Sequence, residues 1–177
     1  GWVDSLRWDV SGERVGMQVR VTNGDDPDGS SAMVRTFVVA VSDGSVVSLP
    51  SPAAWADMPV GWGPDSAFLM GNDTGRDPAR RFVVLSGKPQ QKVGQVPISA
   101  DTGQMGASLW SVSPDAQLLA TLPDRGDDQT GSTAVRDLVV WRLSDGVEVA
   151  RVPLGRVLTD SAQVVGWVDA TTPVISY

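Results

Sequence analysis

The sequence contains no cysteine and no histidine among its 177 residues. These absences exclude disulfides, thiolate nucleophiles, histidine-based triads and zinc sites built from Cys and His. They leave the redox compartment undetermined, because a disulfide-free domain works on either side of a membrane. Carboxylate chemistry remains, but the expected inner strands offer only the scattered Asp9, Asp57 and Asp160. The sequence therefore favours a binding role over catalysis.

Glutamate is also scarce, with 2 residues against 19 aspartates, and the net charge is −7. Aspartate suits turns because its short carboxylate bonds nearby backbone amides, whereas glutamate suits helices. Together with 12 Pro and 19 Gly, this skew predicts a single all-β domain of short strands and many turns. An acidic surface repels phosphate backbones, so we expect no nucleic-acid partner.

Long apolar runs are missing as well, which predicts no membrane insertion by this segment, and no signal peptide is visible. The compartment stays open. One location that fits is an extracytoplasmic part of a secreted or membrane-anchored protein.

What the sequence does contain is a repeat, shown most completely by residues 109–153. This segment has four β-type runs separated by turn residues, which predicts one four-stranded antiparallel meander. The predicted repeats cover residues 1–50, 51–97 and 98–153, with a half-repeat at 154–177. A tryptophan is predicted to end the first run of each unit and to pack in the core or between units: Trp8, Trp62, Trp110 and Trp167.

The third run of each unit aligns best between the copies. Arg35, Arg81 and Arg136 are predicted to begin equivalent third strands. Alternation along those strands predicts that six side chains lie on buried faces. These are Phe37, Val39, Phe82, Val84, Leu138 and Val140.

Two segments of the third unit resemble β-propeller blades. Residues 138–146 are similar to the third strand and following turn of a WD40-type blade, and residues 113–120 to the first hairpin of WD40-like and TolB-like blades. The WD40 signature residues are absent, since Arg142 stands where the motif has Asp and the chain has no His. The resemblance implies an all-β, propeller-like fold of about three and a half four-stranded blades.

Three acidic loops, at residues 22–31, 71–79 and 123–133, are predicted to join the second and third strands of their units. In a propeller these connections project from one face, which would collect carboxylates there. The candidate binding residues are Asp25, Asp26, Asp28, Asp73, Asp77, Asp124, Asp127 and Asp128, with Arg35, Arg81 and Arg136 beside them. The loops are either solvated turns, a contact face for a protein partner, or a cation site.

Calcium is the cation that carboxylate oxygens suit best. In the first loop, however, Pro27 breaks the alternation of ligands, and no bidentate Glu follows. We therefore predict no metal site and no cofactor, with calcium binding by the loops as the alternative.

The arginines have two interpretations: ion pairs or carbonyl caps, or a ring that captures an anionic ligand. The sequence predicts a non-catalytic scaffold that presents acidic loops to a protein. The alternative is a carbohydrate-binding or carbohydrate-active propeller that uses carboxylates and Trp. An open pocket holding both residue types would favour that alternative.

The fourth unit supplies only two strands, so we predict that this chain does not close a propeller by itself. Open sheet edges and faces then require a cover. Further blades before Gly1 are the expected source, and the alternatives are a second copy of the chain or other residues outside the given sequence.

Overall fold

The computed structural model describes residues 2–9, 11–21, 33–48, 57–64, 68–73, 81–86, 91–97, 110–123, 133–158 and 162–176. These residues form antiparallel β-sheet and contain no α-helix. The all-β class predicted from the turn-rich, aspartate-rich composition is therefore confirmed.

Each of the three full repeats forms one four-stranded sheet in which neighbouring strands follow chain order. The first sheet consists of β1 (Trp2–Trp8), β2 (Arg14–Val21), β3 (Met33–Ala40) and β4 (Val46–Ser48). The second consists of β5 (Asp57–Trp62), β6 (Phe68–Asp73), β7 (Arg81–Ser86) and β8 (Gln91–Pro97). The third consists of β9 (Trp110–Val112), β10 (Leu118–Thr121), β11 (Thr133–Arg142) and β12 (Glu148–Leu158). A final pair contains β13 (Gln163–Trp167) and β14 (Pro173–Ser176), so the predicted meanders are confirmed.

The first hairpins of the first and third sheets are held by matching hydrogen bonds. Asp9 N donates to Arg14 O at 3.0 Å, and Ser113 N donates to Leu118 O at 2.9 Å. In the same turns Asp9 Oδ1 accepts from Arg14 N at 3.1 Å, and Ser113 Oγ accepts from Leu118 N at 2.9 Å. Because a carboxylate and a hydroxyl can both accept from a backbone amide, Asp9 and Ser113 serve the same position.

Backbone conformation repeats in these turns as well. Gly12 and Ala116 occupy one left-handed position, with φ of 74° and 57°. Gly44 and Gly146 occupy another, in the turns between third and fourth strands, with φ of 69° and 70°. Non-glycine residues rarely adopt this region, so Ala116 is held there by the turn rather than by its own preference.

In the first and third sheets, a further hydrogen bond connects the turn after the first strand with the turn after the third strand, and it fixes their relative register. Val41 N donates to Glu13 O at 2.8 Å, and Leu143 N donates to Gln117 O at 2.9 Å. Val41 in the first sheet is therefore equivalent to Leu143 in the third.

This equivalence corrects the predicted alignment of the third strands by one residue. Counting back from Val41 and Leu143, Val39 matches Trp141 rather than Val140. A one-residue shift moves a side chain to the opposite face of its sheet. The predicted buried residues therefore do not share a face between sheets, because Phe37 and Val39 lie on one face and Leu138 and Val140 on the other.

Burial at these positions agrees in part with the prediction. Leu138 and Val140 are buried, whereas Phe37 and Val39 are half-buried. Phe82 and Val84 lie in β7, but their side chains are outside the described residues. The third sheet buries both faces of β11, since Val139 between them is also fully buried.

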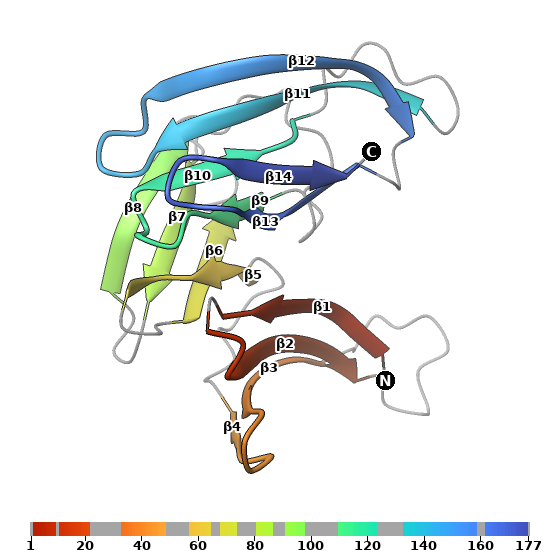
Figure 1. Cartoon of the computed structure of the whole chain (residues 1–177), viewed down its shortest axis with the longest axis vertical. Helices are drawn as coiled ribbons and strands as arrows, with labels where there is room; N and C mark the ends of the chain where they lie inside the picture. The colour runs from red at the N-terminus through yellow and green to blue at the C-terminus, as the bar shows by residue number, and fades with distance from the viewer. Residues whose placement is uncertain are drawn as a thin grey trace.

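The sheets follow one another around an arc (Figure 1). β1 lies against β5, β5 against β9, and β9 against β13, so the first strand of each sheet faces the axis of the arc. The arc stays open between the first sheet and the β13–β14 pair, and the sheets do not close into a ring. The core is concentrated in the second and third sheets and the final pair, where Leu69, Leu119 and Val164 are almost fully buried.

Consecutive sheets meet through specific contacts. The Trp62 indole of the second sheet donates to Arg7 O of the first at 2.9 Å. On the opposite face of β5, a Cβ on Gly61 would lie 3.8 Å from Val112 Cβ of the third sheet. We call the face of a sheet that points to the preceding sheet its leading face, and the opposite one its trailing face. Trp62 and Val112 are leading-face residues, and Gly61 is a trailing-face residue.

Candidate functional site

The predicted acidic loops occupy the slots expected from the sequence, between second and third strands. β6 extends further than expected, to Asp73, and Arg81 begins β7, but the side chains of both residues are outside the described part. Seven of the predicted carboxylates also lie outside the described residues: Asp25, Asp26, Asp28, Asp77, Asp124, Asp127 and Asp128.

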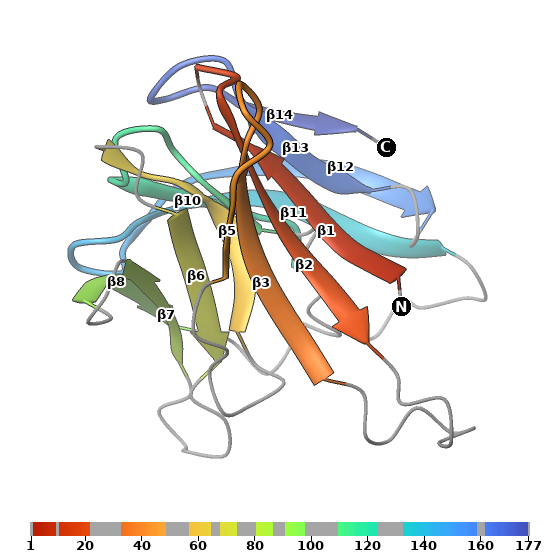
Figure 2. The ribbon, with the colours of Figure 1, turned by 90° about the horizontal axis from the view of Figure 1, so that it is seen from below.

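The strand ends that flank these loops lie at the opposite end of the sheets from the tight turns. In Figure 2, β2 and β6 both end toward the lower side, whereas the β1–β2 and β13–β14 turns lie on the upper side. Arg35, near the start of β3, is exposed at this loop-bearing end.

Arg136 is not equivalent to Arg35, because in the corrected alignment the residue of the third sheet that corresponds to Arg35 is Asp137. The Arg136 side chain is buried, and its Nη1 donates to Leu122 O at 2.7 Å. Leu122 directly follows β10, so Arg136 caps a carbonyl at the loop-bearing end of the third sheet. This matches the structural role that the sequence offered for the arginines, and it contradicts a ring of equivalent arginines.

Asp137 is nearly fully buried and is paired with Arg151 of β12. Arg151 Nη1 lies 2.8 Å from Asp137 Oδ2, and the side chains are 42% and 1% exposed. The same guanidinium makes two bonds to Glu148, Nε to Oε1 at 2.9 Å and Nη2 to Oε2 at 2.7 Å. The hydrogen bonds from Arg151 hold the pKa of Glu148 below its ordinary value. The hydrogen bonds to Glu148 raise the pKa of Arg151 most, and the hydrogen bond to Asp137 raises it further.

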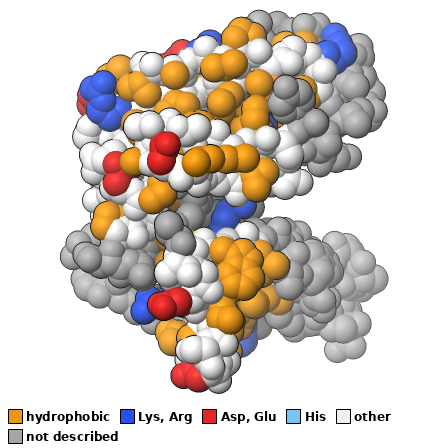
Figure 3. Space-filling view, viewed as in Figure 1, with side chains coloured by type: hydrophobic (Ala, Val, Ile, Leu, Met, Phe, Trp, Pro, Cys, Tyr) orange, Lys and Arg blue, Asp and Glu red, His pale blue; other side chains and the backbone are white. Residues whose placement is uncertain are grey.

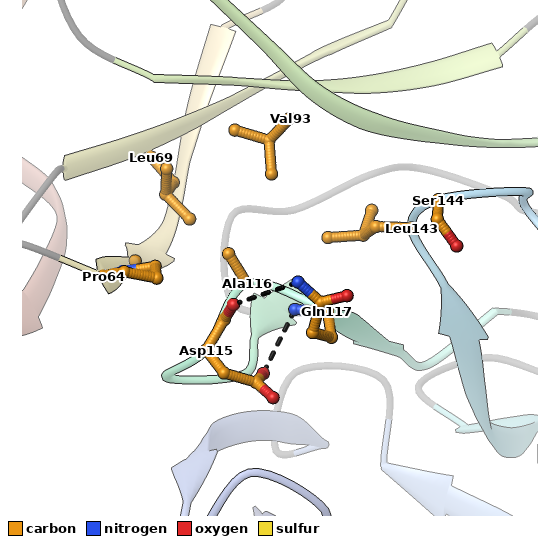
Figure 4. A pocket seen from close by; sticks show the side chains of 9 residues that line it. Pro64, Leu69, Val93, Asp115, Ala116, Gln117, Leu143 and Ser144 are labelled. Atoms are coloured by element: carbon orange, nitrogen blue, oxygen red, sulfur yellow. Dashed lines mark hydrogen bonds between the residues drawn. The ribbon is translucent and has the colours of Figure 1, made fainter.

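A shallow cavity of about 310 Å³ lies between the first hairpins of the second and third sheets (Figure 4). Its walls include Leu69, Val93 and Leu143, and Asp115 and Gln117 border it. Asp115 Oδ1 already accepts from Ser113 Oγ at 2.6 Å and from Gln117 N at 3.1 Å. The carboxylate therefore supports the turn, and the cavity wall contains no Trp among the described residues.

The tryptophans differ in burial. Trp62 and Trp110 are buried, and Trp167 packs partly against the core, as predicted for packing residues. Trp8 contradicts this prediction, since it is 61% exposed. Trp110 also begins β9 instead of ending it, so Val112 is the residue that matches Trp8.

No group of three or more potential metal-ligating side chains occurs within the described residues. In that same part of the chain, no helix is long and apolar enough to cross a membrane.

Comparison of the chain with protein-family models, curated proteins and solved structures finds no match.

Proposed function

We propose that this chain is a non-catalytic binding module, a series of propeller-type blades that presents acidic loops to a protein partner. The observation that carries the proposal is the repeated position of the loops. In three successive sheets an aspartate-containing segment of the chain connects the second strand to the third, and the strand ends that flank it lie opposite the tight turns. Loops on a rigid β scaffold are where binding residues concentrate.

Charge indicates the chemistry of the partner. The chain carries a net charge of −7, and two of the loops contain three aspartates each. Arg136, the buried cation next to the third loop, is bonded to a carbonyl. A partner with a basic surface would be attracted by these carboxylates, and the attraction would weaken as salt screens it.

The carbohydrate alternative gains no specific support from the described cavity. Sugar binding by stacking needs an aromatic ring open to a pocket that also holds polar groups. The cavity beside Asp115 is bordered by a carboxylate that already has hydrogen-bond partners, and no described Trp lines it. Protein binding through the loops is therefore the function that the arrangement supports best.

Neutralising one loop should weaken partner binding strongly. The test variant is Asp25→Asn, Asp26→Asn and Asp28→Asn together, and the matched control is Asp43→Asn, Asp145→Asn and Asp169→Asn. The control removes the same charge from tight turns at the other end of the strands. We expect the loop variant to lose about 10-fold or more in affinity, with a smaller loss at high salt, because several charge pairs contribute together.

The partner is first captured from source-cell extract on immobilised protein, then purified and titrated by calorimetry. Equal affinities of the loop variant and the turn variant would contradict the proposal.

A further inference from the structure

The leading face of the first sheet is exposed at positions that the third sheet buries. Trp8 is 61% exposed, whereas its counterpart Val112 is 3% exposed. Val41 is 52% exposed, whereas its counterpart Leu143 is 1% exposed. Local sequence does not cause this difference, since both members of each pair are apolar. The third sheet is covered because a sheet precedes it in the arc.

The contacts of the third sheet show what kind of surface covers a leading face. Gln95 N of β8 donates to Leu143 O at 3.2 Å, so the cover is the outer strand of a neighbouring sheet. Gly94 allows this approach, because its ideal Cβ would lie only 2.6 Å from Leu143 Cβ. At the equivalent interface between the first and second sheets, the Trp62 indole donates a hydrogen bond to Arg7 O. A leading face is therefore covered by apolar contact combined with backbone hydrogen bonds.

The exposed residues of the first sheet form one continuous apolar surface. Leu6 pairs with Met17 and Trp8 with Val15, so the two exposed side chains of β1 share a face. Val46 of β4 pairs with Val39 on that same face and is 60% exposed. Figure 3 shows apolar side chains gathered over the first sheet in the lower part of the molecule. Contiguous exposed apolar surface of this kind is typical of interaction sites.

The complementary surface is present on the other end of the same chain. Val165 and Val174 of the final pair are 56% and 37% exposed, although their neighbours Val164 and Ile175 pack into the core. Gly166 precedes Trp167 as Arg7 precedes Trp8, and a Cβ on Gly166 would meet no atom within 4 Å.

We propose that the leading face of the first sheet binds the trailing face of the final pair, where Val165 and Val174 are exposed, in a second copy of this chain. Trp8 of one copy would take the place that Trp62 takes within the chain, with its indole directed at the open backbone beside Gly166. The contact is head-to-tail, so each copy uses two different surfaces. This interface goes beyond the proposed loop function and uses none of the loop carboxylates.

The test is sedimentation velocity on purified protein from about 1 to 100 μM, a range that detects micromolar association. The leading-face variant is Trp8→Asp, and the trailing-face variant is Val165→Asp. The matched control is Val47→Asp, which changes a 56% exposed valine on the opposite face of β4. Circular dichroism of each variant checks that the fold is retained, as expected for substitutions at exposed positions.

We expect the wild type and Val47→Asp to associate with rising concentration and each face variant to remain monomeric. Mixing Trp8→Asp with Val165→Asp should restore a complex that stops at two copies, because one intact surface of each kind remains. A monomeric wild type at every concentration would overturn the proposal. So would association of Val165→Asp alone, which would indicate a symmetric contact between two leading faces, or equal loss of association by Val47→Asp.

Discussion

Replacing Gly94 with alanine is expected to lower the free energy of unfolding by about 3 kcal/mol, at the upper end for overpacking of a close contact. The added Cβ would lie 2.6 Å from Leu143 Cβ and 2.8 Å from Leu143 C. Leu143 cannot move aside easily, because its N–H donates to Gln117 O and its carbonyl accepts from Gln95 N. The second and third sheets would therefore have to separate locally.

Gly166→Ala is the control for this prediction. It also adds a methyl group to a strand glycine, but nothing lies within 4 Å of the new Cβ. Urea denaturation of both variants measures the difference. A Gly94→Ala protein as stable as Gly166→Ala would show that the second and third sheets do not approach as described.

Replacing Arg151 with alanine is expected to cost about 2 kcal/mol of stability, because it leaves the carboxylate of Asp137 buried without this cation. Asp137 is 1% exposed, whereas Arg151 is 42% exposed. Because water screens the exposed cation, the loss of stability should be smaller than for a fully buried ion pair. Arg142→Ala is the matched control, since it removes a 2.8 Å pair with Asp145 in which both side chains are well exposed. We expect the control to cost less than about 1 kcal/mol.

Two further measurements distinguish charge from packing at this site. Adding Asp137→Asn to Arg151→Ala removes the buried charge and should recover part of the lost stability. The pKa of Glu148 is lowered in the folded state by Arg151, so its contribution is present above the unfolded pKa and is lost as the pH falls through the folded value. The wild type should therefore lose stability between pH 5 and 3, estimated roughly from the ordinary carboxyl range, more steeply than Arg151→Ala. If Asp137→Asn recovers no stability and the wild type and Arg151→Ala have identical pH profiles, the stability lost in Arg151→Ala comes from lost packing and not from charge.

The sequence predicts the strands and turns of this fold well, because their signals are local. Turn residues such as Gly44 and Gly146 occupy equivalent left-handed positions, and glycine is the residue that adopts them without strain. The acidic segments also fall between second and third strands in the chain, as predicted, although β6 extends into the second of them, to Asp73. Each of these features depends on residues that are neighbours in the chain.

The register of the third strands could not be obtained in the same way. Val139 and Val140 are consecutive and both buried, so β11 has no alternation from which to assign its faces. The similar positions of Arg35 and Arg136 then favoured an alignment that was wrong by one residue. Hydrogen bonds between the turns, at Val41 and Leu143, identify the correct one.

The sequence does not indicate the exposed leading face, for a different reason. Trp8 and Trp62 each end the first strand of a sheet, yet one is 61% exposed and the other 5%. Burial here depends on whether another sheet precedes the strand in the arc, and no local pattern reports that. The half-repeat at the end of the chain predicts that some sheet surfaces stay open and need a cover. It does not identify the residues on those surfaces.

The most direct measurement of how successive sheets stack is disulfide formation by Gly63→Cys with Ala116→Cys. A Cβ on Gly63 would lie 3.5 Å from Ala116 Cβ, within the range of about 3.5 to 4.5 Å that a disulfide needs. The chain has no other cysteine, so a bond between the two is unambiguous. Gly12→Cys with Gly63→Cys is the control, because a Cβ on Gly12 would meet no atom within 4 Å.

Mass spectrometry under non-reducing conditions measures the outcome after air oxidation. If the leading face of the third sheet packs on the second, the 63–116 pair should oxidise within the monomer and the 12–63 pair should remain as free thiols. Free thiols in the 63–116 protein, or equal oxidation of both pairs, would contradict the stacking of sheets on which this account depends.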